Sequence, residues 1–118
     1  MFKRLIFVKR RSDLTHQEFR DYYENVHVPL VSSMRTIQPL VYRRNYVTPS
    51  DPNADALMAG RGSPAGADYD CITEVVFRTR EDAAPPPADV IERLRRDEAN
   101  FMAPDGLAIQ VVEVYEEF

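Results

Sequence analysis

Residues 2–30 read FKRLIFVKRRSDLTHQEFRDYYENVHVPL, and this stretch decides the fold because it holds a strand and a helix in direct succession. Its first part, residues 2–9, is rich in Leu, Ile, Phe and Val and is bounded by charged residues. Such a short apolar run predicts a strand with apolar side chains on both faces.

The second part of the stretch predicts a helix. Thr15 is followed three residues later by Glu18, which is the capping-box pattern of a helix start, and apolar residues then recur at helical spacing to about Val26 or His27. Pro29 has no amide hydrogen and clashes with the preceding turn, so we expect the helix to kink or stop there.

The rest of the chain predicts three more strands and one more helix. Alternating or continuous apolar residues indicate strands at 40–47, 70–79 and 107–116. A helix is expected to start near Pro87 and to be ended by Pro104 and Gly106. Residues 48–69 show no periodicity and contain several prolines and glycines, which predicts a long irregular connection.

The resulting order, β-α-β-β-α-β, predicts an α+β ferredoxin-like fold in which an antiparallel four-stranded sheet carries two helices on one face. A length of 118 residues indicates a single domain, residues 1–118. Two helices cover only one face of a sheet whose strands are apolar on both. We therefore expect a homodimer whose sheets pack face to face as a dimeric α+β barrel.

Composition narrows the function classes. A formal charge of −4 argues against a nucleic-acid partner, whose binding rests on neutralising phosphates. Cys71 is the only cysteine, so it forms no intramolecular disulfide, is expected to be structural, and cannot build a cysteine zinc site with the two histidines. Without an apolar leader or a run of about eighteen apolar residues, we expect a cytoplasmic protein with no metal site and no membrane partner.

A histidine interrupts the apolar stripe of the first helix. Phe19, Tyr23, His27 and Leu30 share one helical face, which places an imidazole toward the sheet. His27 is either a buried neutral ring bonded to a backbone carbonyl or a proton carrier at the mouth of a cleft. The neighbouring Tyr22 is expected to serve packing.

A carboxylate interrupts the second helix in the same way. Asp97 follows Val90 and Leu94 on the stripe that continues to Phe101. If the two helices lie side by side, Asp97 reaches His27, orients the ring and raises its basicity. The alternative is a surface ion pair of Asp97 with Arg93 or Arg96.

The strand at 40–47 carries further candidates. Tyr42, Arg44 and Tyr46 alternate on one face, so two phenols and a guanidinium could line the space beneath the helices. Asn45 would then face the interior of the barrel. The opposite register remains open.

The stretch LIFVKRRSDLTHQEFRDYYENVHVPL, together with YRRNYV and RRDEANF further along, resembles the EthD family of small dimeric α+β barrel proteins. The resemblance spans most of the chain and is weakest over residues 48–69. It implies the same fold. By position it carries the family's H-x-P histidine onto His27 and its second-helix acid onto Asp97.

The resemblance also implies activities, because similar fungal and bacterial proteins act as cofactor-free dehydratases, decarboxylases or cyclases on aromatic and polyketide-like compounds. We therefore expect a cofactor-independent lyase with His27 as base or acid and Asp97 as its orienting partner. Tyr46 or Tyr23 would donate to a carbonyl or phenolate oxygen, and Arg44 would hold an anionic substituent. Further substrate-binding residues are expected to be Tyr42, Asn45 and Phe101.

Two other functions remain open on the sequence alone. One is a non-catalytic dimer that binds an aromatic metabolite or assists a catabolic oxygenase. The other is an oxygenase of the same barrel superfamily, for which His27 would be the available haem ligand because His16 is expected to be exposed.

Overall fold

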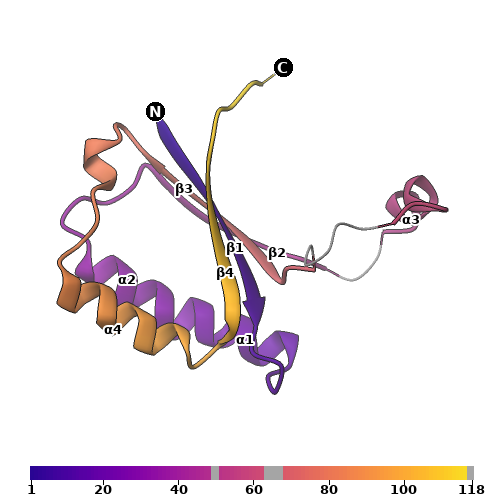
Figure 1. The fold of residues 1–118 in the computed structure, drawn as a ribbon, viewed down its shortest axis with the longest axis horizontal. Coiled ribbons are helices and arrows are strands. Elements are labelled where there is room, and N and C mark those ends of the chain that lie inside the picture. The colour runs from indigo at the N-terminus through magenta and orange to yellow at the C-terminus, as the bar shows by residue number, and fades with distance from the viewer. Residues whose placement is uncertain (49–50, 63–67, 117–118) are drawn as a thin grey trace.

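The structure is a computed structural model, and it describes residues 1–48, 51–62 and 68–116. Helices lie on one side of a twisted sheet, as Figure 1 shows. In chain order the elements are β1 (Phe2–Arg10), α1 (His16–Tyr22), the π-helical turn η1 (Tyr23–His27), α2 (Val28–Met34), β2 (Val41–Tyr46), α3 (Pro52–Met58), β3 (Cys71–Phe77), the 3₁₀ turn η2 (Glu81–Ala83), α4 (Ala88–Glu98) and β4 (Met102–Val112).

The sheet has the strand order β2-β3-β1-β4, and all of its pairs are antiparallel. The continuous run of α1, η1 and α2 packs on one face of it together with α4 (Figure 1). The expected ferredoxin-like α+β fold is confirmed. The sheet can hold both helices on one face because each crossover from β1 and from β3 returns on the same side.

The first helix begins as predicted but does not stop at Pro29. Thr15 accepts from the Glu18 backbone N–H, and the Glu18 carboxylate accepts from the Thr15 N–H, so the capping box is complete. The Val28 N–H bonds to the Tyr23 carbonyl five residues back, which makes a wide π turn. Pro29 then lies in the first turn of α2, and the helix continues to Met34.

The end of the second helix also differs from the prediction. Helix α4 ends at Glu98 without help from a proline, and Pro104 and Gly106 lie inside β4. Strand β4 pairs only with β1, so it is an edge strand, and an edge strand tolerates a proline that cannot donate. The register shifts between Val8 and Arg10 opposite this segment, and the irregularity brings the chain close to Gly106.

The connection between β2 and β3 is not wholly irregular. It contains α3, whose N-terminus is capped by the Asp51 side chain accepting from the Asn53 N–H. A proline in the first turn favours that start. Every described residue of 51–62 is exposed, and α3 stands away from the sheet in Figure 1. Residues 49–50 and 63–67, which belong to the same predicted connection, lie outside the described residues.

The core lies between the sheet and the helices. Strand β3 alternates strictly, with Cys71, Thr73, Val75 and Phe77 buried toward the helices. Phe19 and Phe101 fill the space above them and are almost completely buried. Burial raises the pKa of the Cys71 thiol to about 11, which fits the structural role expected for it.

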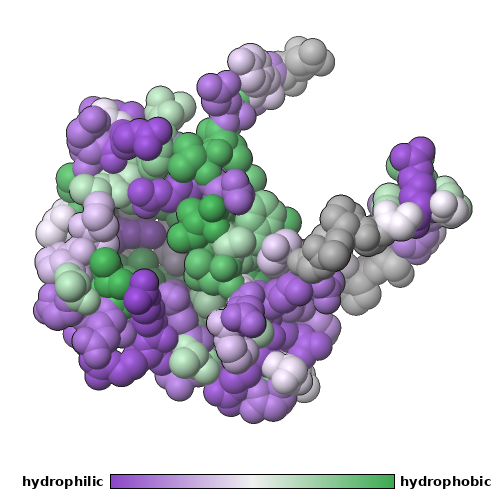
Figure 2. Space-filling model, in the orientation of Figure 1, coloured by the Kyte–Doolittle hydropathy of each residue, from purple (hydrophilic) through white to green (hydrophobic). Residues whose placement is uncertain are grey.

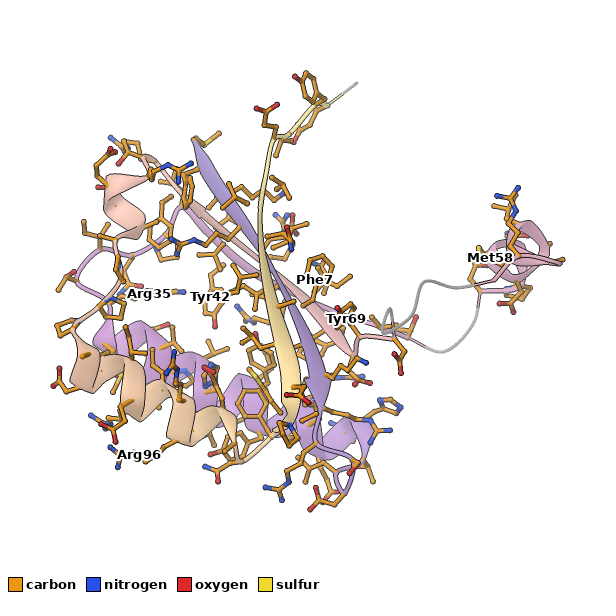
Figure 3. All side chains as sticks on the ribbon, viewed as in Figure 1. Phe7, Arg35, Tyr42, Met58, Tyr69 and Arg96 are labelled. Atoms are coloured by element: carbon orange, nitrogen blue, oxygen red, sulfur yellow. The ribbon has the colours of Figure 1, made fainter. Side chains whose placement is uncertain are left out.

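The other face of the sheet has no helix on it. In Figure 3 Phe7 points away from the side on which Tyr42 lies. Leu5, Ile72 and Val76 share the Phe7 side and are only half-buried. No helix in the described part of the chain is long and apolar enough to cross a membrane.

Candidate functional site

A cavity of about 580 Å³ opens between the helices and the sheet. It lies between α2, α4 and the turn η2, and Figure 2 shows the hollow beside the hydrophobic residues of the strands. Its walls are mainly apolar, with Ile6, Val31, Leu94 and Ile109 among them. A cleft of this size and character is typical of small-molecule sites.

His27 and Asp97 meet at the wall of this cavity. The His27 Nδ1 lies 2.8 Å from the Asp97 Oδ2, and the two side chains are only 8% and 11% exposed. Phe19 and Tyr23 anchor the first helix in the core, so His27, one turn further on, has to face the sheet. The structure therefore brings together the two polar residues that interrupt the helical stripes. The alternative, a surface ion pair of Asp97 with an arginine, is not what the structure shows.

The hydrogen bond to Asp97 defines which nitrogen of His27 carries the hydrogen. A carboxylate only accepts, so the Nδ1 of His27 carries the hydrogen and donates it to Asp97. Burial lowers the pKa of His27, and the bond to Asp97 opposes that shift without cancelling it. The ring is thus neutral at pH 7, with the lone pair of Nε2 available on a residue that lines the cavity.

Tyr22 packs against the core, as expected, and its hydroxyl also belongs to this arrangement. Its hydroxyl donates to the second carboxylate oxygen of Asp97 at 2.7 Å and accepts from the Asn100 side chain at 2.9 Å. Tyr22 also stacks on Phe101 at 5.2 Å between ring centroids. The hydrogen bond from Tyr22 to one carboxylate oxygen of Asp97 helps to hold the other oxygen beside His27. The only sequence signal for this hydrogen bond is that Tyr22 borders the apolar stripe.

Arg44 and Tyr46 have a partner that the sequence did not indicate. Arg44 donates to both oxygens of Glu24, at 2.9 and 2.8 Å, and the Tyr46 hydroxyl donates to the same carboxylate at 2.6 Å. Arg44 lowers the pKa of Glu24, and burial raises the pKa of Tyr46. These groups saturate one another and do not line the cavity.

Of three other candidate residues, Tyr23 lines the same cavity as His27, Phe101 packs on His27, and Asn45 lies elsewhere. The Tyr23 hydroxyl bonds to the Thr73 hydroxyl at 2.8 Å, and its pKa is raised by burial. Phe101 packs on His27 with 4.8 Å between ring centroids. Asn45 lies on the opposite face of the sheet, where it donates to Glu74, so the structure does not bring it together with His27.

Tyr42 and Arg35 face the cavity from the sheet and from the end of α2. The Tyr42 ring lies between two guanidinium groups, 4.4 Å from Arg35 and 4.7 Å from Arg44. Figure 3 shows Arg35 and Tyr42 directed toward each other across the space between helix and strand. Sequence reasoning missed Arg35, because it follows the helix that was expected to end near Pro29.

The cavity contains a further titratable residue. Glu98 lines it from α4, and burial raises the pKa of its carboxyl group. No group of three His, Cys, Asp or Glu residues close enough to hold a metal ion exists among the residues described. His16 is exposed, as expected, and is 3.4 Å from Asp70.

Comparisons with known proteins agree with this architecture. The family model of the EthD domain matches residues 11–105. The chain is similar to the crystal structure of an EthD family protein from Bacillus halodurans, with a TM-score of 0.60, 19% sequence identity, and coverage of 98% of this chain and 100% of that one. That likeness shows the fold. No curated protein matches the chain. The match over residues 11–105 shows that the chain belongs to the EthD domain family.

Proposed function

We propose that this protein is a cofactor-independent lyase that acts by acid–base catalysis on a small aromatic or polyketide-like metabolite. The observation that carries the proposal is the buried His27–Asp97 pair at the wall of an apolar cavity. A neutral imidazole held by a carboxylate is a general base, and groups of this kind supply about a hundredfold to ten-thousandfold in rate. Such help suits a substrate with an acidic C–H and a leaving group.

For a dehydration the proton balance is simple. The His27 Nε2 takes a proton from the carbon next to a carbonyl group, and the electrons of that C–H bond move toward the carbonyl oxygen. The C–O bond to the leaving hydroxyl then breaks while a C=C bond forms. The proton on Nε2 passes to the departing oxygen, which leaves as water, and His27 returns to its neutral state.

Tyr42 is the phenol placed to assist. The Tyr46 hydroxyl donates to Glu24, and the Tyr23 hydroxyl pairs with Thr73. The Tyr42 hydroxyl, by contrast, has no protein partner in the described part of the chain. A hydroxyl in an apolar cavity donates to the developing enolate oxygen more strongly than to the ground-state carbonyl. In this proposal Tyr42 takes the role that the sequence suggested for Tyr46 or Tyr23.

The active form is proposed to be a homodimer. The sheet face opposite the helices presents half-buried apolar side chains around the Lys3–Glu74–Arg43 ion pairs. A second copy offers the same mixture of apolar and oppositely charged groups, so two such faces complement each other. The cavity lies on the helical side of the sheet and stays accessible in such a dimer.

The function is tested by incubating the protein with hydroxylated aromatic ketones and β-keto compounds and measuring loss of water or carbon dioxide by mass spectrometry. Product formed by the wild type and not by His27→Ala or His27→Gln supports the lyase. Arg96→Gln is the matched control, because Arg96 is exposed and points away from the cavity (Figure 3). Saturable binding without product from any compound would instead identify a binding protein.

A further inference from the structure

Arg35 differs from every other arginine at the cavity. Its backbone is extended, which ends α2 and turns the side chain toward the sheet, and it lines the cavity wall. Its Nη1 is sealed from solvent and has no hydrogen-bond partner in the described part of the chain. No ion pair connects Arg35 to a described carboxylate. The guanidinium of Arg35 instead lies over the face of the Tyr42 ring in a cation–π contact.

The other arginines at or near the cavity either donate hydrogen bonds to protein groups or are exposed to solvent. Arg4 donates to the Ala83 carbonyl at 3.0 Å, and Arg95 is exposed to solvent. Arg44, the other guanidinium over the Tyr42 ring, donates to both oxygens of Glu24 and to the Tyr42 carbonyl. Arg35 is thus a guanidinium at the wall of an apolar cavity for which the described residues provide no side-chain hydrogen bond or ion pair, and the acidic cavity residues Glu81, Asp82 and Glu98 do not pair with it.

Arg35 is partly buried, and a partly buried cation without an ion partner is costly, so a folded protein retains one where something compensates for it. A guanidinium stays protonated in proteins, so it cannot escape the cost by losing its charge. A cation–π contact compensates in part. A carboxylate compensates fully, because it matches the planar fork of the guanidinium with two parallel hydrogen bonds.

We infer that Arg35 binds the carboxylate of an anionic aromatic ligand, whose ring lies in the apolar cavity between Tyr42 and His27. This inference rests on the proposed function in that it assigns the ligand of the same cavity. Burial of the His27 ring is the main cause that lowers its pKa, and the positive charge of Arg35 adds a smaller lowering through charge repulsion. A bound carboxylate would relieve that repulsion.

The assignment also separates the possible reactions. In a decarboxylation the carboxylate loses its charge to the carbon that is left behind, so a guanidinium that grips the carboxylate stabilises the starting state and slows the step. In a dehydration the substrate keeps its carboxylate and its charge, so binding of the carboxylate by Arg35 does not raise the barrier. Arg35 therefore favours loss of water from a substrate that keeps its carboxylate.

The test compares two ligands of equal shape. Titration calorimetry at pH 7.5 measures the Kd of 4-hydroxybenzoate and of 4-hydroxybenzamide, which lacks the charge, against wild type, Arg35→Gln, Arg35→Met and Arg96→Gln. Wild type and Arg96→Gln are expected to prefer the carboxylate about tenfold to a hundredfold, the range of a hydrogen bond to a charged group. Both Arg35 variants are expected to bind the two ligands equally. The Arg96 control removes the same charge from an exposed site.

Melting temperatures of the four proteins accompany the titrations. The Arg35 variants are expected to melt no lower than wild type, because they remove a partly buried charge that has no ion-pair partner among the described residues. The inference is overturned if wild type shows no preference for the carboxylate, which includes failure to bind either compound, or if the preference survives in Arg35→Gln. A carboxylate preference without turnover of any compound would refute the lyase and leave the anion site standing.

Discussion

Replacing Asp97 with Asn tests whether the carboxylate tunes the histidine or merely packs beside it. The substitution keeps the shape of the side chain and leaves an oxygen that can still accept from the His27 Nδ1–H. Only the negative charge is lost. Because the carboxylate raises the pKa of His27 against the stronger effect of burial, its loss lowers that pKa further.

The magnitude follows from the type of hydrogen bond. A bond to a charged group contributes about 1.5–3 kcal/mol and a neutral bond about 0.5–1.5 kcal/mol, so the change removes about 1 kcal/mol from the protonated state of His27. Both side chains are nearly buried, so solvent screening takes little from this figure. The expected loss in kcat/KM is up to about tenfold, since about 1.4 kcal/mol corresponds to a factor of ten. His27→Ala should lose about a hundredfold or more.

The assay is the pH dependence of kcat/KM for a compound that the wild type converts. A general base works while it is unprotonated, so activity falls on the acid side as pH drops through the pKa of His27, which lies below 6.5. In Asp97→Asn this acid limb is expected at lower pH than in wild type. Glu92→Gln is the control, because it makes the same charge change at an exposed site on the same helix.

Two results would refute this reasoning. One is an acid limb that stays in place or moves to higher pH in Asp97→Asn, which would show that the charge does not act on the catalytic base. The other is a loss of activity in His27→Gln that merely follows the loss of folded protein, measured by thermal melting. In that case His27 is a structural residue of the core.

Three further changes test the fold around the site. Lys3, with help from Asn45 and Arg43, lowers the pKa of Glu74 to about 2, so the stabilising effect of the Glu74 carboxylate is complete above pH 4.5 and is lost as pH falls toward 2. Denaturation of Glu74→Gln should therefore show destabilisation at pH 6 that disappears near pH 2, and an equal loss of stability at both pH values would contradict the ion-pair explanation. Phe7→Glu on the face without helices is expected to reduce the mass in light scattering from twice 13.6 kDa to 13.6 kDa, whereas a wild type that is already monomeric would exclude the barrel dimer. Gly106→Ala places a Cβ 2.7 Å from the Ala103 carbonyl and 2.8 Å from that of Lys9, so it should cost about 2 kcal/mol in urea unfolding, while Gly62→Ala, with open space around it, should change nothing.

The sequence by itself determined the order of the elements and the faces they bury. Strand and helix periodicities are local properties, so the alternation of β3 and the capping box at Thr15 can be recognised without any partner. The same periodicity placed His27 and Asp97 on the inward stripes of two helices. Their meeting needed only the further assumption that the helices lie side by side on one sheet face.

The expectations for two prolines failed because the folded structure accommodates each of them. Pro29 ends an isolated helix, but a π turn before it lets the helix continue. Pro104 interrupts an inner strand, but β4 is an edge strand with no second neighbour to bond. The edge position of β4 depends on the strand order of the whole sheet, which the residues around Pro104 do not encode.

The partners of the polar groups were decided by tertiary structure alone. Tyr22 donates to a carboxylate 75 residues further along the chain, and Glu24 draws Arg44 and Tyr46 away from the cavity. Glu24 pairs with Arg44, and Arg35 is left without a hydrogen-bond partner for its Nη1 among the described residues. Hydrogen bonds and ion pairs depend on distances of a few ångströms between segments far apart in sequence, and a chain of residue types specifies those distances only once it is folded.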